Sequence, residues 1–175
     1  MIEASLTPAQ LMWVDVIIST IQQDRFNLKI GDMNYVLGNM VAKFVSSADK
    51  YKISEGALQH IKLIGLNPLE PIHIKKYIYG KNRATLLEHM IPASFIKKAL
   101  VESRNNEVHM KKILSNAGSV VIVLRKEDEL LKAAGLNKLM PSNWEGFGDD
   151  PTKRYLVAGI NIAEIEIIHE GPICR

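Results

Sequence analysis

The stretch Ser119-Val120-Val121-Ile122-Val123-Leu124 is the clearest strand in the chain, and it decides the fold class. A short run of β-branched and other apolar residues of this kind is typical of a strand. Arg125-Lys126 leads out of the run into Glu127–Ala134, where an acidic first turn and the following Gly135 predict a helix. The sequence therefore predicts a strand that leads directly into a helix.

Residues 1–66 are predicted to form a helical subregion. Thr7-Pro8 has the pattern of an N-cap followed by proline in the first turn, which predicts a helix over about 8–24. Gly31-Asp32 opens a second helix and Ser54-Glu55 a third, shorter one. Apolar residues recur at helical spacing in the first two, at Leu11, Val14, Ile17, Ile18 and Ile21, and at Met33, Val36, Leu37, Met40, Val41, Phe44 and Val45. We expect this subregion to supply core rather than chemistry.

Prolines interrupt the helical pattern after residue 66. Asn67-Pro68 and Glu70-Pro71 mark the expected boundary with a mixed subregion over 71–175, because proline disfavours helix at the residue before it. Ile72–Tyr79 is rich in β-branched and aromatic residues, which favours a strand but leaves a helix open. A turn at 80–82 and a second extended segment over Ala84–Met90 should follow.

The rest of the chain alternates between helix and turn signals. Pro92 suits the first turn of a helix that continues through Leu100, and Asn116-Ala117-Gly118 ends a further helix that passes through Val108 and Leu114. Turn-forming residues fill 140–151, and the tail over 155–168 should be a strand. We expect one α+β domain over 1–175, with a helical N-terminal part packed on a small sheet and a ββα-like core at 79–134.

Composition sets limits on location and stability. The 175 residues are 47% hydrophobic, enough for a core that needs no disulfide or structural metal. The sole cysteine, Cys174, excludes an intramolecular disulfide and a cysteine-based zinc site. The N-terminus has no basic n-region, and no apolar run approaches the roughly 18 residues that span a bilayer. We expect a cytoplasmic protein with no membrane partner.

Positive charge gathers in the middle of the sequence. The net charge is +3, but the segment from His73 to Lys112 holds nine basic and three acidic residues and so carries +6. Such an excess attracts nucleic-acid phosphate, although a solvated lysine face is an equally valid interpretation. The candidate nucleic-acid contacts are Lys75, Lys76, Lys81, Arg83, Lys97, Lys98, Arg125 and Lys126.

A carboxylate and an imidazole adjoin where the chain is expected to pass from strand to helix. They are Glu88 and His89, followed by Met90-Ile91-Pro92. Histidine is the usual general base near neutral pH, and a carboxylate can hold a divalent cation. The alternative is that the pair merely caps the Pro92 turn or forms hydrogen bonds around it.

The segment Glu88–Pro92 resembles the signature of the HNH, or His-Me finger, endonucleases. The resemblance implies a two-stranded ribbon and a helix that grip a divalent metal, Mg²⁺ or Mn²⁺, with His89 activating water and Glu88 binding the metal. It also implies a last metal ligand from the strand-to-helix segment 120–131, which here would be Glu127 or Asp128. The likeness covers about 79–131. The chain has acidic residues where the family has Asn or His, and it lacks the family's cysteine pairs.

Three functions follow as hypotheses. The first is a metal-dependent endonuclease that hydrolyses nucleic-acid phosphodiesters. The second is a non-enzymatic regulatory module that binds nucleic acid or protein through the basic 73–112 region. The third is a homo-oligomer that uses the Met-rich second helix as its interface. The long loop and its flank also contain aromatic and basic residues. We expect them either to stack on a base or to pin the loop to the core; they are Trp144, Phe147, Arg154 and Tyr155.

Overall fold

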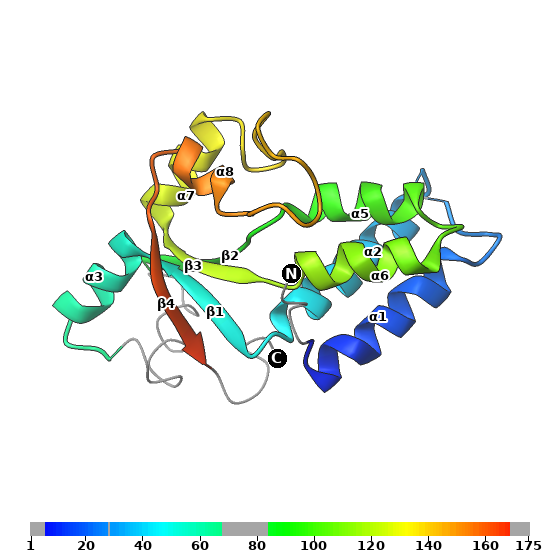
Figure 1. Ribbon diagram of the computed structural model, residues 1–175, viewed down its shortest axis with the longest axis horizontal. Helices are drawn as coiled ribbons and strands as arrows, with labels where there is room; N and C mark the ends of the chain where they lie inside the picture. Colours follow the sequence, from blue (N-terminus) through cyan, green and yellow to red (C-terminus); the bar gives the residue numbers. More distant parts are fainter. Residues whose placement is uncertain (1–5, 28, 68–83, 169–175) are drawn as a thin grey trace.

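The computed structural model describes residues 6–27, 29–67 and 84–168 of the chain. The elements, labelled as in Figure 1, are α1 (Pro8–Ile21), α2 (Gly31–Ser46), β1 (Lys50–Ser54), α3 (Glu55–Leu63), β2 (Thr85–His89), α5 (Ala93–Glu102), α6 (Glu107–Ala117), β3 (Val120–Leu124), α7 (Arg125–Ala133), α8 (Lys153–Val157) and β4 (Ile162–Ile168). The fold is α+β, as the sequence predicts. The strand expected over 72–79 and the turn at 80–82 lie outside the described residues.

The helices α1 and α3 begin where their capping residues predict. The Thr7 side chain accepts a hydrogen bond from the Gln10 amide at 3.1 Å, while the Gln10 side chain accepts one from the Thr7 amide at 3.2 Å. The Ser54 hydroxyl accepts one from the Ala57 amide at the start of α3. Each of these bonds satisfies an amide that lacks a partner within its helix. The helix α2 begins at Gly31, as predicted, but without a side-chain cap.

The strands form one mixed sheet in the order β2-β3-β1-β4. β3 runs parallel to β1 and antiparallel to β2, and β4 runs antiparallel to β1. Strand β1 was not predicted, because it lies inside the subregion that was expected to be wholly helical. It has only five residues and lies between two helices with strong sequence signals. The alternation of exposed Lys50 with buried Tyr51 and Ile53 is too short to indicate a strand by itself.

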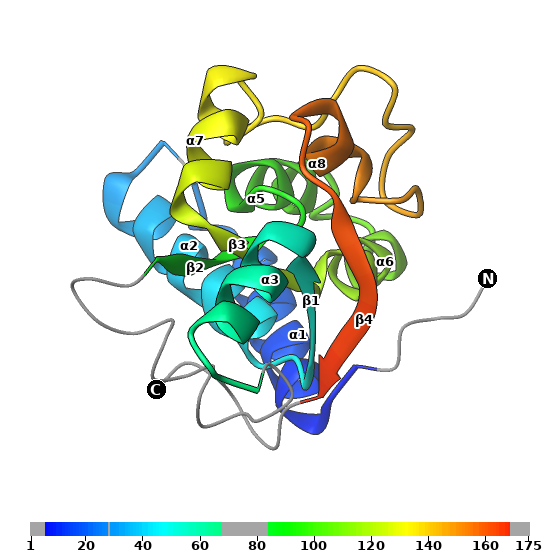
Figure 2. The same cartoon turned by 90° about the vertical axis from the view of Figure 1, so that its left-hand side faces the viewer.

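Strand β3 is buried on both faces, which explains its wholly apolar sequence. Val120, Ile122 and Leu124 belong to a large core that also includes side chains from α1, α2, α3, α5 and α6. Val121 and Val123 belong to a second, smaller core with side chains from α7 and α8. Figures 1 and 2 both show α7 and α8 lying together over one side of the sheet, while α1, α2, α5 and α6 gather at its other side and end.

The tail differs from the prediction of a continuous strand over 155–168. Lys153–Val157 forms the helix α8, and Gly159, with φ of +75°, turns the chain before β4 begins at Ile162. Asp150 favours the helical start because its carboxylate accepts hydrogen bonds from the amide and hydroxyl of Thr152. Tyr155 thereby enters the second core instead of a strand.

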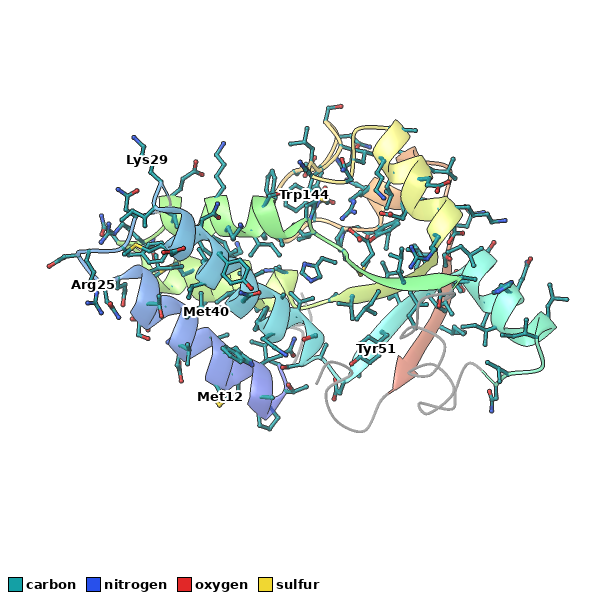
Figure 3. The ribbon with its side chains drawn as sticks, turned by 180° about the vertical axis from the view of Figure 1, so that it is seen from behind. Met12, Arg25, Lys29, Met40, Tyr51 and Trp144 are labelled. Atoms are coloured by element: carbon teal, nitrogen blue, oxygen red, sulfur yellow. The ribbon has the colours of Figure 1, made fainter. Side chains whose placement is uncertain are left out.

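Aromatic side chains pin the long loop before α8 to α5. The rings of Trp144 and Phe147 lie 5.3 and 6.0 Å from that of Phe95, and 5.5 Å from each other. Figure 3 shows Trp144 between the loop and the first turns of α5. Of the two interpretations of these loop aromatics, the geometry supports anchoring to the core.

Among the described residues, no helix has the length and apolar character that crossing a bilayer requires.

Candidate active site at the end of strand β2

The pairing of β2 with β3 places Glu88 and His89 on opposite faces of the sheet. Glu88 lies opposite Val121 and His89 opposite Val120. Directly paired residues point to the same face of a sheet, and neighbours along a strand alternate. Glu88 therefore points toward the second core, under α7 and α8, while His89 points toward the large core. Because β2 is an edge strand of the described sheet, both side chains border the same edge.

β2, β3 and α7 form a strand–strand–helix unit. The two strands are antiparallel over their full five-residue length, and α7 begins directly after β3. The helices α5 and α6 separate the two strands in the sequence. A two-stranded ribbon followed by a helix is the order that the resemblance to the His-Me finger enzymes implies.

Asp128 on α7 is the acidic residue that acts on Glu88. Its negative charge contributes to raising the pKa of Glu88. Asp128 also forms an ion pair with Lys132, one turn later on the same helix. The Glu88 charge in turn contributes to raising the pKa of Lys132, so Glu88, Asp128 and Lys132 interact on the α7 side of the sheet.

Glu127, the other acidic candidate, has a structural role. It is buried, and its Oε2 accepts hydrogen bonds from the Ser54 hydroxyl at 2.5 Å and from the Leu124 amide at 2.7 Å. These bonds tie the start of α7 to the junction of β1 and α3. Leu124 pairs with Thr85, at the end of β2 that is remote from His89. Of the two acidic candidates, Asp128 therefore has an electrostatic effect on Glu88, while Glu127 holds the junction of β1 and α3.

Arg154 on α8 is the cationic partner of Glu88. Its guanidinium donates from Nη2 to Glu88 Oε1 at 2.7 Å, and from Nη1 to the carbonyl oxygens of His89 at 2.8 Å and Met90 at 3.3 Å. The Tyr155 hydroxyl donates to the same His89 carbonyl at 3.3 Å. Arg154 is fully buried, whereas 22% of the Glu88 side chain is exposed.

Burial and charge set the protonation of the Glu88–His89 pair. Burial is the main cause that raises the pKa of Glu88 above its ordinary value, and the hydrogen bond and charge of Arg154 oppose it. Burial, helped by the positive charge of Arg154, lowers the pKa of His89 from 6.5 to about 4. The imidazole is consequently neutral at neutral pH, the state in which it can accept a proton.

The candidate nucleic-acid contacts are scattered rather than gathered at this site. Lys75, Lys76, Lys81 and Arg83 lie outside the described residues. On α5, Lys97 donates to the Asn34 side chain at 2.7 Å, and exposed Lys98 lies 3.8 Å from Glu102. Arg125 and Lys126 are exposed at the start of α7, near Asp128 in sequence.

The donor set near Glu88 suits a weakly held oxygen-seeking cation. Among the described residues, no three His, Cys, Asp or Glu side chains converge to hold a metal ion. Mg²⁺ needs less than that, since it usually binds one or two carboxylates and takes its other ligands from water and substrate phosphates. Glu88 and Asp128 are the carboxylates that could hold such a cation, which would compete with Arg154 for Glu88 and with exposed Lys132 for Asp128.

Sequence reasoning did not foresee that Arg154 belongs to this site. It placed Arg154 and Tyr155 beside the long loop, as residues that either stack on a base or pin the loop to the core. In the fold both side chains point inward, to residues 65 and 66 positions earlier in the chain. No local sequence pattern reports a contact of that range.

No family model matches this chain. A search of curated proteins and a search of solved structures likewise found no significant match.

Proposed function

We propose that this protein is a metal-dependent endonuclease that hydrolyses phosphodiester bonds of nucleic acid at the end of β2. The observation that carries the proposal is the order of β2, β3 and α7, which puts Glu88 near the end of the first strand and Asp128 in the first turn of the helix that follows the second. The negative charge of Asp128 also adds to the burial that raises the pKa of Glu88. By the resemblance, Glu88 and Asp128 would be metal ligands and the adjacent His89 would be the general base.

The chemistry follows from the protonation states. Neutral His89 accepts a proton from a water molecule at an imidazole nitrogen, and the water oxygen attacks phosphorus. The bond from phosphorus to the leaving oxygen then breaks. Glu88 and Asp128 would hold the divalent cation, which supplies Lewis-acid stabilisation of negative charge on the phosphate and the leaving oxygen. The phosphodiester would lie at the β2 edge, which both side chains border.

Basic side chains supply the attraction for the substrate. Exposed Arg125 and Lys126 precede Asp128 by three and two residues on α7, and Lys132 follows it by one turn. Their contribution is electrostatic and should weaken with added salt, because binding to a phosphate backbone releases counterions.

Cleavage of labelled single- and double-stranded DNA and RNA, with Mg²⁺, Mn²⁺ or EDTA, tests the metal-binding part of the proposal. We expect cleavage by the wild-type chain with either cation, and a loss of at least about 100-fold in Asp128→Asn, a size typical of removing an electrostatic contact to the reacting centre. Glu129→Gln is the matched control, since Glu129 is an exposed neighbour on α7. Equal activity of both variants would contradict the assignment.

The same samples separate the nuclease from a binding module. A chain that retains labelled oligonucleotide without cleaving it under any of these cations, and releases it as salt is raised, is the non-enzymatic module that the basic 73–112 region suggests.

A further inference from the structure

The fully buried guanidinium of Arg154 is the most unusual side chain of the described residues. Transfer of a charge out of water is costly unless the charge is paired and hydrogen-bonded. Arg154 meets the requirement with three acceptors at 2.7, 2.8 and 3.3 Å, and its Nε has no hydrogen-bond partner among the described residues. A buried cation retained in this way calls for an explanation beyond packing.

All three acceptors belong to the consecutive residues Glu88, His89 and Met90. This is the point at which β2 ends and the chain turns toward α5. From the sheet side, the Met90 amide donates to the Ser119 carbonyl at 3.2 Å. The turn is therefore held by the sheet on one side and by α8 on the other.

The shape of the guanidinium links the side chain of Glu88 to the backbone of His89. One nitrogen binds the two carbonyl oxygens and another binds the carboxylate, and the two nitrogens are fixed in one plane. A neutral donor at this place would satisfy a carbonyl but would not orient the carboxylate with a charge-assisted bond. A lysine would supply the charge without the planar fork.

We propose that Arg154 is a positioning residue of the Glu88–His89 site, holding the Glu88 carboxylate and the backbone that carries the His89 ring in one fixed geometry. The link to hydrolysis rests on the proposed function, while the geometric role does not.

The first experiment measures hydrogen exchange of the Met90 amide by NMR at one fixed pH in the full chain, with wild type compared with Arg154→Lys and Arg154→Gln. That amide donates to the Ser119 carbonyl, so its exchange reports opening of the turn that Arg154 holds. We expect exchange at least about 10-fold faster in Arg154→Gln and an intermediate rate in Arg154→Lys, because lysine keeps the charge without the planar fork. The Ala57 amide, at the start of α3, is the internal reference. An unchanged Met90 exchange rate in folded Arg154→Gln would overturn the proposal.

The glutamine variant leaves buried Glu88 without its cation and is the one most at risk of not folding. The double variant Glu88→Gln with Arg154→Met removes both charges together and keeps the test available. It should also show faster exchange of the Met90 amide, because no guanidinium ties α8 to the turn. The same rate as in wild type would again contradict the proposal.

The second experiment measures steady-state cleavage by Arg154→Lys. We expect kcat to fall by about 10- to 100-fold with KM nearly unchanged, because a displaced base and metal ligand impair the reaction more than substrate binding. Full kcat in this variant would overturn the positioning role. If the wild-type chain cleaves nothing, the proposed function fails, and the exchange rate of the Met90 amide still decides the geometric role of Arg154.

Discussion

At the scale of single residues, the environment of His89 differs from that of an exposed histidine. The side chain is partly buried, it lies at the end of an edge strand of the described sheet, and a buried cation is near it. Burial and that cation both disfavour the imidazolium form, so the ring stays neutral over most of the physiological pH range. The ring is therefore in the form that can accept a proton. Because its pKa is low, it is also a weak base.

The position of the acid limb in the pH profile of cleavage follows from this pKa. Protonation of His89 in the free enzyme should abolish activity as the pH approaches about 4, while protonation of Glu88, whose pKa is raised above its ordinary 4.5, should weaken metal binding before that. Measurement of kcat/KM from about pH 4 to pH 8 at saturating metal checks this. A decline centred at the ordinary histidine value of 6.5 would show that His89 is not the base or that its environment differs.

At the scale of elements, the packing of α3 on α7 depends on Gly56. A Cβ added there would lie 2.5 Å from Glu127 Oε1 and 3.2 Å from Leu124 Cδ1. Glu127 has little freedom to move, because it is buried and accepts bonds from Ser54 and Leu124. The approach of the two helices therefore requires glycine at this position.

We expect Gly56→Ala to lower the free energy of unfolding by about 1 to 3 kcal/mol, as for other overpacked sites. Urea unfolding followed by circular dichroism measures the change. The matched control is Gly38→Ala in α2, where the added Cβ would lie 3.6 Å from Lys97 Nζ, an ordinary contact. Alanine there should be neutral or stabilising by up to about 1 kcal/mol, since it is the better helix former. A Gly56→Ala protein as stable as the wild type would refute this account of the junction.

Sequence was a good guide to elements with strong local signals and a poor one to the rest. The caps at Thr7 and Ser54 and the apolar run of β3 report structure over a few residues, and the structure confirms them. The strand β1 and the helix α8 have five residues each and weak local patterns, so neither was predicted. Glu88 and His89 were recognisable because they adjoin in the sequence, whereas Arg154 reaches them only through the tertiary fold.

At the scale of the whole molecule, the two predicted subregions share one sheet and one core. β1 from the first subregion lies between β3 and β4 from the second, and the large core contains residues of both. The acidic and cationic groups around Glu88 come from β2, α7 and α8. The geometry of the proposed site consequently depends on the folding of the entire second subregion.

The pH dependence of global stability should carry the contribution of His89. Its folded pKa of about 4 lies below the ordinary 6.5, so between these values the unfolded chain binds more protons than the folded chain. The free energy of unfolding should therefore fall as the pH falls from about 6.5 to about 4. The loss is at most about 3.5 kcal/mol, from about 2.5 pKa units at about 1.4 kcal/mol each.

Urea unfolding of the wild type and of His89→Asn across that range isolates this effect. The difference between the two proteins removes the contribution of Glu88, whose raised pKa acts with the opposite sign. We expect a shallower decline in His89→Asn. Parallel curves for the two proteins would mean that His89 titrates alike in the folded and unfolded states.

The central claim is that His89 activates water at a metal-dependent site, and single-turnover cleavage by His89→Ala tests it most directly. The matched control is His109→Ala, which removes an exposed imidazole from α6. We predict that His89→Ala loses at least about 100-fold in rate, within the range expected for a general base, while its circular dichroism and metal dependence are retained. His109→Ala should cleave like the wild type. Undiminished cleavage by folded His89→Ala would contradict the claim.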